Sequence, residues 1–247
     1  MFSIFKKKNA YVDNGYFPIN TDMHSHILPG IDDGSPNVET SIELVKGLMA
    51  LGLKQSIATP HIIGDLYRNN TETISTALST LRHALAENKI EYKVNAAAEY
   101  MLDFYFLELL EKKIPLLTIK DNIILTEFSY AERPQKVEQI LFSIITEGYQ
   151  PILAHPERYA YYHSDLKYYN HLADIGFQLQ VNLLSLTGYY GPNVAKAANF
   201  IIKNNLVSYT GTDLHHSRHI AALQDTKNKA IFADVFKNKT LNEEFVF

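Results

Sequence analysis

The sequence predicts an α/β fold in which strands and helices alternate and the parallel sheet closes, or nearly closes, into a barrel. The first observation is that short β-rich runs alternate with runs of helical periodicity along the whole chain. The second is that seven such strand–helix units, about 30 residues apart, are more typical of a barrel than of an open doubly wound sheet. The third is that neither GxGxxG nor GxxxxGK[ST] occurs, so a nucleotide-binding sheet gains no support.

Each element is expected where its own pattern is found. Strands are expected at 18–23, 54–59, 92–97, 121–126, 151–154, 177–182 and 206–210. Helices are expected between them, at 36–51, 72–88, 103–113, 134–147, 165–175, 192–204 and 219–234. The first helix has the clearest signals, with Ser35 as N-cap, Pro36 as the first helical residue and Gly52 at the C-terminal cap. With no linker in sight, residues 21–247 are expected to form a single domain after an N-terminal extension, 1–20.

The composition excludes several classes of protein. The chain has 247 residues, of which 46% are hydrophobic, so it can bury a core and is not a disordered chain. Its formal net charge of −4 leaves no basic excess, and no nucleic-acid partner is expected. The absence of cysteine excludes disulfides, thiolate metal sites and a cysteine nucleophile, and it fits a reducing compartment.

The N-terminal extension carries Phe2, Ile4 and Phe5 directly before three lysines. This order is not that of a secretory signal, and no stretch approaches 18 apolar residues, so no membrane span is expected. Such a segment could touch an anionic membrane surface, although a frayed tail is the commoner state of a terminus. The expected location is therefore the cytoplasm, with contact at the membrane periphery as an alternative.

Polar, metal-capable side chains follow nearly every predicted strand. In chain order these are His24, His26, His61, Glu99, Glu127, His155, Asn182, Asp213 and His215. In an α/β barrel the carboxyl ends of the strands meet at one rim, where the βα loops build the active site. A single histidine after a strand is usually structural, but so many on one rim predict a metal centre.

The donor set indicates the kind of metal. Imidazole and carboxylate without sulfur suit zinc, manganese or iron. The donors are too numerous for one ion, so a cluster of two or three divalent ions is expected. Such a cluster lowers the pKa of water and holds the attacking and leaving oxygens of a phosphate.

The strings "DMHSHILPGIDDGSPN", "SIATPH", "ILTEF", "ILAHPERY" and "TDLHH" resemble the motifs of the PHP superfamily, named for polymerase and histidinol phosphatase domains. The match is closer to one branch, the bacterial metal-dependent protein tyrosine phosphatases of capsule and exopolysaccharide operons. The resemblance covers about 21 to 235. It implies a distorted (βα)7 barrel with the metal site at the C-terminal rim of the strands, and manganese as the usual metal, with iron or zinc as alternatives.

The residues that match the family's metal ligands are His24, His26, Asp33, His61, Glu99, His155, Asp213 and His215. The resemblance implies that Glu99 bridges two ions. The first would also be held by Asp213 and the two histidines after the first strand, and the second by His61 and His155.

Asp33 and His215 would serve a third ion, near His61. Of the two adjacent aspartates only Asp33 matches the family's ligand, so Asp32 is expected to cap the turn or the helix that follows.

Two arginines are candidates for the phosphate site. Arg158, in the HPER string, resembles a family arginine that grips the phosphoryl group, and a guanidinium fork matches phosphate oxygens. The alternative for Arg158 is a surface ion pair with Glu157. Relatives often carry a second arginine where this chain has Ile220, and Arg218 could do the same work from a shifted loop.

The resemblance implies hydrolysis of phosphotyrosine in a protein or peptide, such as the tyrosine-rich tail of a membrane-bound autokinase that controls polysaccharide assembly. A small-molecule phosphatase acting on histidinol phosphate or a sugar phosphate would use the same metals. A metal-stabilised module without catalysis is another alternative, although every ligand position is filled. A polymerase-associated nuclease is disfavoured by the missing basic surface. The oligomeric state is left open.

Overall fold

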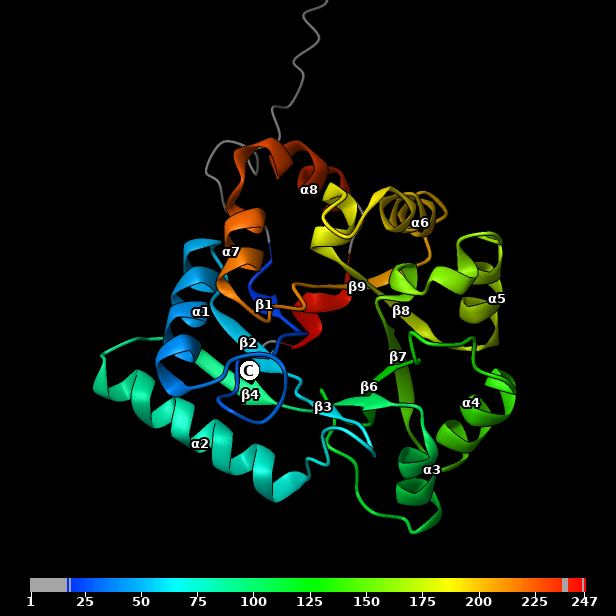
Figure 1. Ribbon diagram of the computed structural model, residues 1–247, viewed down its shortest axis with the longest axis horizontal. Coiled ribbons are helices and arrows are strands. Elements are labelled where there is room, and N and C mark those ends of the chain that lie inside the picture. Colours follow the sequence, from blue (N-terminus) through cyan, green and yellow to red (C-terminus); the bar gives the residue numbers. More distant parts are fainter. Residues whose placement is uncertain (1–16, 18, 237–239, 246) are drawn as a thin grey trace, which may run out of the picture.

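The computed structural model describes residues 17, 19–236, 240–245 and 247, and it places the strands at the centre with the helices around them (Figure 1). The predicted extension, 1–20, therefore lies almost entirely outside the described residues. The strands in this part of the chain are β1 (Thr21–Asp22), β2 (Gln55–Ala58), β3 (His61–Ile62), β4 (Lys93–Ala96), β5 (Glu99–Met101), β6 (Ile123–Glu127), β7 (Gln150–Ala154), β8 (Gln178–Asn182) and β9 (Val207–Gly211). The α-helices are α1 (Val38–Ala50), α2 (Thr71–Glu87), α3 (Phe104–Glu111), α4 (Val137–Thr146), α5 (Tyr168–Ile175), α6 (Pro192–Lys203), α7 (Ser217–Gln224) and α8 (Lys229–Val235).

All pairs between these strands are parallel, which confirms the α/β class. They form two sheets, with the orders β1-β2-β4 and β3-β5-β6-β7-β8-β9. The second and third predicted strands, 54–59 and 92–97, are observed as β2 and β4. Each is followed, after a break, by a short strand that was not predicted, β3 after β2 and β5 after β4. Pro60 lies at the first break and has no N–H to donate to a ladder. Backbone bonds such as Glu99 N to Pro60 O, at 3.1 Å, nevertheless continue across it.

The segments that follow the first and last strands lie side by side. The N–H of His26 donates to the carbonyl of Leu214 at 2.9 Å, and the N–H of Asp213 donates to the carbonyl of His24 at 2.9 Å. Ser25 and Leu214 form an isolated parallel bridge. This pairing brings together motifs from opposite ends of the sequence.

Alternation of side chains along the strands separates two faces. On β8, Leu179 and Val181 belong to the apolar cluster that packs with α4, α5 and α6. The other face of the strands contributes a smaller cluster that includes Met23, Ile57 and Tyr209. Phe245, from the 3₁₀ helix Leu241–Phe245, stacks on Tyr209 at a centroid distance of 5.0 Å. The inner core is thereby covered at the amino ends of the strands.

The start of the first helix differs from the prediction. Its N-cap is Asn37, whose side chain accepts from the N–H of Thr40 at 2.9 Å, and the helix begins at Val38. The predicted cap, Ser35, is held in the preceding loop, where its N–H donates to the carbonyl of His26 at 3.0 Å. The predicted C-terminal cap is confirmed, since Gly52 has the positive φ of 92° that ends helices.

The last predicted helix, 219–234, is observed as α7 and α8 with a break between them. Asp225 caps α7 in an extended conformation, and its side chain accepts from the N–H of Lys227 at 3.0 Å. Such local bonds from an aspartate compete with continued helix. None of the described helices combines the length and hydropathy that crossing a membrane requires.

Candidate metal centre

The predicted ligands lie together at the carboxyl ends of the strands. They are contributed by the segment after β1, the start of β3 and of β5, and the turns that follow β7 and β9. His155 and Asp213 both have left-handed backbone, with φ of 35° and 49°. This conformation is uncommon for residues other than glycine and is concentrated at functional sites. It turns the chain out of the strand at two positions of the predicted centre.

Glu99 is the middle of the cluster and is fully buried. Its Oε2 lies 3.3 Å from Nε2 of His24 and 3.3 Å from Nε2 of His26. The same oxygen lies 3.2 Å from Nδ1 of His61, while Oε1 lies 2.9 Å from Nε2 of His155. One carboxylate therefore faces imidazoles from four different segments of the chain.

Two further carboxylates extend the cluster toward solvent. Oδ1 of Asp213 lies 3.4 Å from Nε2 of His24 and 3.3 Å from Nδ1 of His215. Oδ1 of Asp33 lies 3.5 Å from Nε2 of both His61 and His215. Asp33 is exposed, so this side of the cluster is its open side.

The arrangement fits metal binding better than hydrogen bonding. Oε2 of Glu99, Nδ1 of His61 and Oε1 of Glu127 are buried, and none of them makes a hydrogen bond to the described residues, although Nδ1 of His61 and Oε1 of Glu127 lie 2.9 Å apart. Several N···O separations are 3.2–3.5 Å, which is long for a charge-assisted hydrogen bond. Two atoms that bind one tetrahedral ion at about 2.1 Å lie about 3.4 Å apart. The residues present therefore fit divalent ions held by nitrogen and oxygen.

In the part of the chain that the structure describes, four overlapping sets of side chains have potential ligand atoms within 4.8 Å of one another. They are His26–Asp33–His61–His215, His24–His26–Asp213, His24–Glu99–His155 and His61–Glu99–Glu127. All eight predicted ligands occur in these sets. The sets also include Glu127, which the sequence indicated as a polar strand end but which was not among the predicted ligands.

The electrostatics keep the acids ionised. Burial alone raises the pKa of Glu99, but the charges of His24 and His61 outweigh it and hold that pKa well below its usual value. Burial likewise opposes ionisation of Asp213, whose pKa is held well below its usual value by His24 and His215. Ionised carboxylates are the form that binds a metal. Histidines bind a metal in their neutral form, so a bound ion would take the place of the positive charges on these rings.

The other ring nitrogens of several histidines are occupied by the protein. Nδ1 of His26 lies 2.8 Å from Oδ2 of Asp32, and Nδ1 of His155 lies 3.2 Å from the hydroxyl of Tyr130. Asp32 also accepts from the N–H of Gly34 at 3.0 Å, so it caps this turn, one of the two roles expected for it, and orients His26 as well. Partners of this kind fix which nitrogen a histidine offers to a metal.

Arg158 lies at the mouth of the cluster, with its side chain 25% exposed. Its Nη1 lies 2.7 Å from Oδ2 of Asp213, and its guanidinium lies over the rings of Tyr130 and Tyr190, at 5.1 and 4.4 Å from their centroids. Glu157 is instead buried and accepts from the N–H of Asn182 at 2.9 Å. The alternative of a surface pair between Arg158 and Glu157 is therefore wrong.

Arg218 is not brought into this site. A cavity of about 290 Å³ opens over the cluster, and Tyr190, Arg158, His216 and His219 are among its lining residues. Arg218 is exposed and is not among them. His216 and His219 are three residues apart and share one side of the first turn of α7, whereas Arg218 lies on another side.

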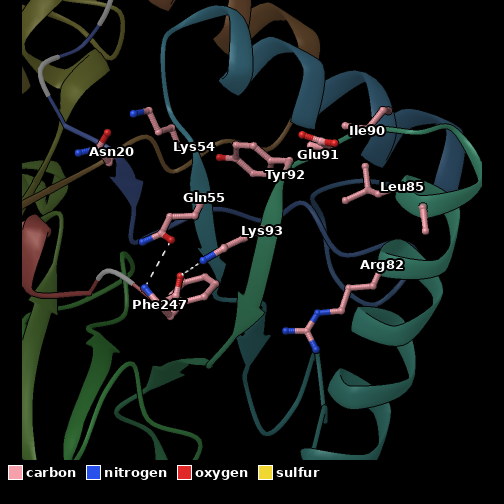
Figure 2. A pocket seen from close by; sticks show the side chains of 11 residues that line it. Asn20, Lys54, Gln55, Arg82, Leu85, Ile90, Glu91, Tyr92, Lys93 and Phe247 are labelled. Atoms are coloured by element: carbon pink, nitrogen blue, oxygen red, sulfur yellow. Dashed lines mark hydrogen bonds between the residues drawn. The ribbon is translucent and has the colours of Figure 1, made fainter.

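A larger cavity, of about 720 Å³, lies at the other ends of the strands, against the start of β2 and β4 and the helix α2 (Figure 2). Its lining includes Lys54, Arg82 and Lys93. Arg82 donates to the carbonyl of Val94 at 2.8 Å, and Lys93 donates to that of Phe247. None of the sets of potential metal ligands in the described residues lies there.

Residues 20–231 match the model of a protein family described as capsular polysaccharide synthesis, CpsB/CapC. The tyrosine-protein phosphatase YwqE of Bacillus subtilis (strain 168) is 30% identical over 196 residues, which cover 79% of this chain and 77% of that protein. The tyrosine-protein phosphatase CpsB of Streptococcus pneumoniae is 28% identical over 201 residues, which cover 79% and 82%.

Solved structures agree with the fold. A crystal structure from a study of YwqE from Bacillus subtilis and CpsB from Streptococcus pneumoniae, described as unique metal-dependent tyrosine phosphatases, matches with a TM-score of 0.75 and 28% identity. The match covers 85% of this chain and 86% of that one. Histidinol phosphate phosphatase from Lactococcus lactis, solved with zinc, L-histidinol and phosphate, matches with a TM-score of 0.50 and 15% identity over 85% and 93% of the chains. At that identity the second match shows the fold alone.

Proposed function

Since the chain belongs to the CpsB/CapC family of capsular polysaccharide synthesis, we propose that it is a metal-dependent protein-tyrosine phosphatase. The observation that carries the proposal is the buried set of imidazole nitrogens and carboxylate oxygens around Glu99, which opens into a cavity lined by Arg158. Relatives named tyrosine-protein phosphatases support the reaction.

We further propose that the two parallel sheets act as one distorted (βα)7 barrel. Its seven strand positions would be β1, β2 with β3, β4 with β5, and β6 to β9, with the segments after β1 and β9 closing the ring. The hydrogen bonds between those two segments support closure.

The centre is proposed to hold two or three divalent ions, with manganese expected first and iron or zinc as alternatives. One ion would be held by His24, His26 and Asp213 with Glu99, and Glu99 would also serve a second ion. At that second ion His61 and His155 would join Glu99, and the proximity of Glu127 to His61 and Glu99 supports Glu127 as a further ligand. A third ion would be held by Asp33, His61 and His215.

Bound divalent ions supply positive charge at the phosphoryl oxygens and lower the pKa of water near phosphorus. The chain's own contribution is orientation. Arg158 would donate its N–H groups to the phosphoryl oxygens and stabilise the charge that develops on them. Asp213, Tyr130 and Tyr190 hold its guanidinium in place. The leaving phenolate needs little help from an acid, because the pKa of tyrosine is about 10.

We propose that the specific substrate is phosphotyrosine in the tail of a membrane-bound tyrosine autokinase that controls polysaccharide synthesis. This agrees with the description of the family and with a cytoplasmic location at or near the membrane. No described feature favours a nucleic-acid partner over a phosphoprotein, and the net charge of −4 disfavours it.

The test is turnover of a phosphotyrosine peptide by the full chain after chelation and after addition of Mn²⁺, Fe²⁺ or Zn²⁺. Turnover should disappear on chelation and return with at least one of the metals. Histidinol phosphate and an aryl phosphate serve as comparison substrates. Preference for histidinol phosphate would overturn the substrate, and no turnover of any of them with metal bound would favour a binding module.

A further inference from the structure

Three buried hydrogen bonds join two members of the proposed metal centre through side chains of β8. Oε1 of Gln180 lies 2.7 Å from Nδ1 of His24. Nε2 of Gln180 lies 2.8 Å from Oδ1 of Asn182, and Nδ2 of Asn182 lies 2.7 Å from Oδ2 of Asp213. Gln180 and Asn182 have no exposed surface. The sequence indicates Asn182 as a polar strand end, whereas Gln180 is not among the predicted site residues.

The direction of this chain of bonds follows from its last member. Oδ2 of Asp213 accepts from Nη1 of Arg158 at 2.7 Å, and an amide nitrogen can only donate, so Nδ2 of Asn182 also donates to this oxygen. The Oδ1 of Asn182 is then left to accept from Nε2 of Gln180. Oε1 of Gln180 is in turn left to accept from a hydrogen on Nδ1 of His24.

The consequence for His24 is a fixed tautomer. With its hydrogen on Nδ1, the ring presents the lone pair of Nε2 to the centre, where Oε2 of Glu99 lies 3.3 Å away and Oδ1 of Asp213 lies 3.4 Å away. The carboxylate of Asp32 orients the ring of His26 in the same way, through its contact with Nδ1. For His24 the partner is a neutral amide, which orients the ring without adding another negative charge.

The neighbouring strands are built to let this contact form. Gln180 and Asn182 are two residues apart on β8 and so point to the same face. A Cβ on Gly211 of β9 would lie 2.9 Å from Nε2 of Gln180 and 2.8 Å from Cβ of His24. Glycine at this position therefore leaves the space through which Gln180 reaches His24.

We infer that Gln180 and Asn182 are positioning residues that hold His24 with its hydrogen on Nδ1 and couple its orientation to that of Asp213. The inference rests on the proposed metal centre but not on the reaction it catalyses. Residues that orient metal-binding histidines typically contribute about 10–100-fold to metal affinity.

The first test compares Gln180→Met with Gln178→Met. Gln178 lies on the same strand and the same face, at its amino end, where its side chain accepts from the hydroxyl of Tyr209 at 3.4 Å. Zn²⁺ affinity is measured by competition with a chelator of known affinity. We expect Gln180→Met to weaken Zn²⁺ binding by about 10–100-fold and Gln178→Met to leave it within about twofold. Equal affinities in the two folded variants would overturn the inference.

A second measurement reports the hydrogen on Nδ1 of His24 directly. In ¹⁵N-histidine-labelled, Zn²⁺-loaded protein this hydrogen should give a resonance protected from exchange with water. Gln180→Glu keeps an acceptor for His24 and should keep the protected resonance, whereas Gln180→Met should lose it. An unchanged resonance in Gln180→Met would contradict the proposed role.

If Gln180→Met does not fold, the same two measurements are made on Asn182→Leu instead. Leucine matches asparagine in shape but cannot donate to Asp213 or accept from Gln180, so the amide of Gln180 is no longer held in one direction. We expect weaker Zn²⁺ binding and loss of the protected resonance, and wild-type values for both would overturn the inference. If the wild-type protein bound no Zn²⁺, Mn²⁺ or Fe²⁺, the metal centre itself would fail, whereas metal binding without phosphatase activity would leave this inference standing.

Discussion

The two ends of the same strands differ in the state of their polar groups. At the carboxyl ends, buried atoms of Glu99, His61 and Glu127 that could bind a metal make no hydrogen bond within the described part of the chain, and they lie beside a cavity of about 290 Å³. At the amino ends the cavity is larger, about 720 Å³, and it contains the charged side chains seen in Figure 2. There, Arg82 donates to the carbonyl of Val94 at 2.8 Å, and Gln55 donates to the hydroxyl of Thr21 at 2.7 Å.

The difference teaches that buried polar atoms without hydrogen-bond partners indicate a functional site better than the volume of a cavity does. Burying polar atoms without partners destabilises a fold, so a native protein keeps them where a ligand completes them. Charged side chains at a cavity that already donate hydrogen bonds to the chain need no ligand to complete them. Matched substitutions at the two ends of the strands test this contrast.

The largest effect is expected for Glu99→Gln. The change keeps the shape of the side chain but removes the charge that faces four imidazoles, so both metal binding and turnover should fall. We expect turnover of a phosphotyrosine peptide to drop on the order of 10³-fold or more. Metal content of the purified variant is measured in parallel.

Glu91→Gln is the matched change at the amino-end cavity, where Glu91 is exposed. Its turnover and metal content should stay within about twofold of wild type, as is usual for surface substitutions. A comparable loss of turnover in both variants would refute the functional difference between the two ends.

The next effect is expected for Arg158→Gln. Loss of the guanidinium removes hydrogen bonds to the developing phosphoryl charge, and kcat should fall on the order of 10²–10³-fold. Metal content should be retained, because Arg158 belongs to none of the ligand sets. Arg82→Gln, in the other cavity, is the control and should leave kcat unchanged. Loss of metal in Arg158→Gln would assign the arginine a structural role.

A stability effect without a catalytic one is expected for Phe245→Ala. Phe245 is 2% exposed and packs on Tyr209 at the amino ends of the strands. Truncating a buried phenylalanine lowers the free energy of unfolding by about 3–5 kcal/mol. Urea unfolding should show this loss, while kcat at low temperature stays near wild type. A large fall in kcat of the folded variant would show that the two ends are coupled.

The smallest effect is expected for Arg218→Ala. The side chain is exposed and lies outside the cavity lining, so kcat and KM should change by no more than about twofold. His219→Ala is the comparison, because His219 lines the cavity. It should change kcat, KM or both. A fall of tenfold or more for Arg218→Ala would restore its predicted role at the phosphate.

Much of the proposed site could be predicted, because its candidate ligands occur in short, distinctive strings. His24 and His26 share one string, His155 and Arg158 share another, and each string also marks the end of a strand. Parallel strands then bring these ends to one rim whatever the details of packing. The order of strands and helices was predictable for the same reason, since it depends on local periodicity.

Other features were not predicted from periodicity. The cap at Asn37 and the interruption at Asp225 reflect local side-chain bonds that compete with regular structure, and the break before β3 lies at Pro60, which has no N–H to donate. The sequence does contain a sign of the role of Gln180. Polar Gln178, Gln180 and Asn182 alternate with apolar Leu179 and Val181 along β8. Polar residues in that pattern on a buried strand need partners, and the partner is 156 positions away in the sequence.

The sequence by itself determined the α/β alternation, the family and the set of residues able to bind metal, because these properties belong to residue types and short spacings. The tertiary structure decided how that set is used. It placed Glu99 among four imidazoles, gave Glu127 a position beside His61, directed Arg158 toward Asp213 and left Arg218 in solvent. These outcomes depend on the direction of each side chain where the backbone turns, and that direction is fixed only when distant segments pack together.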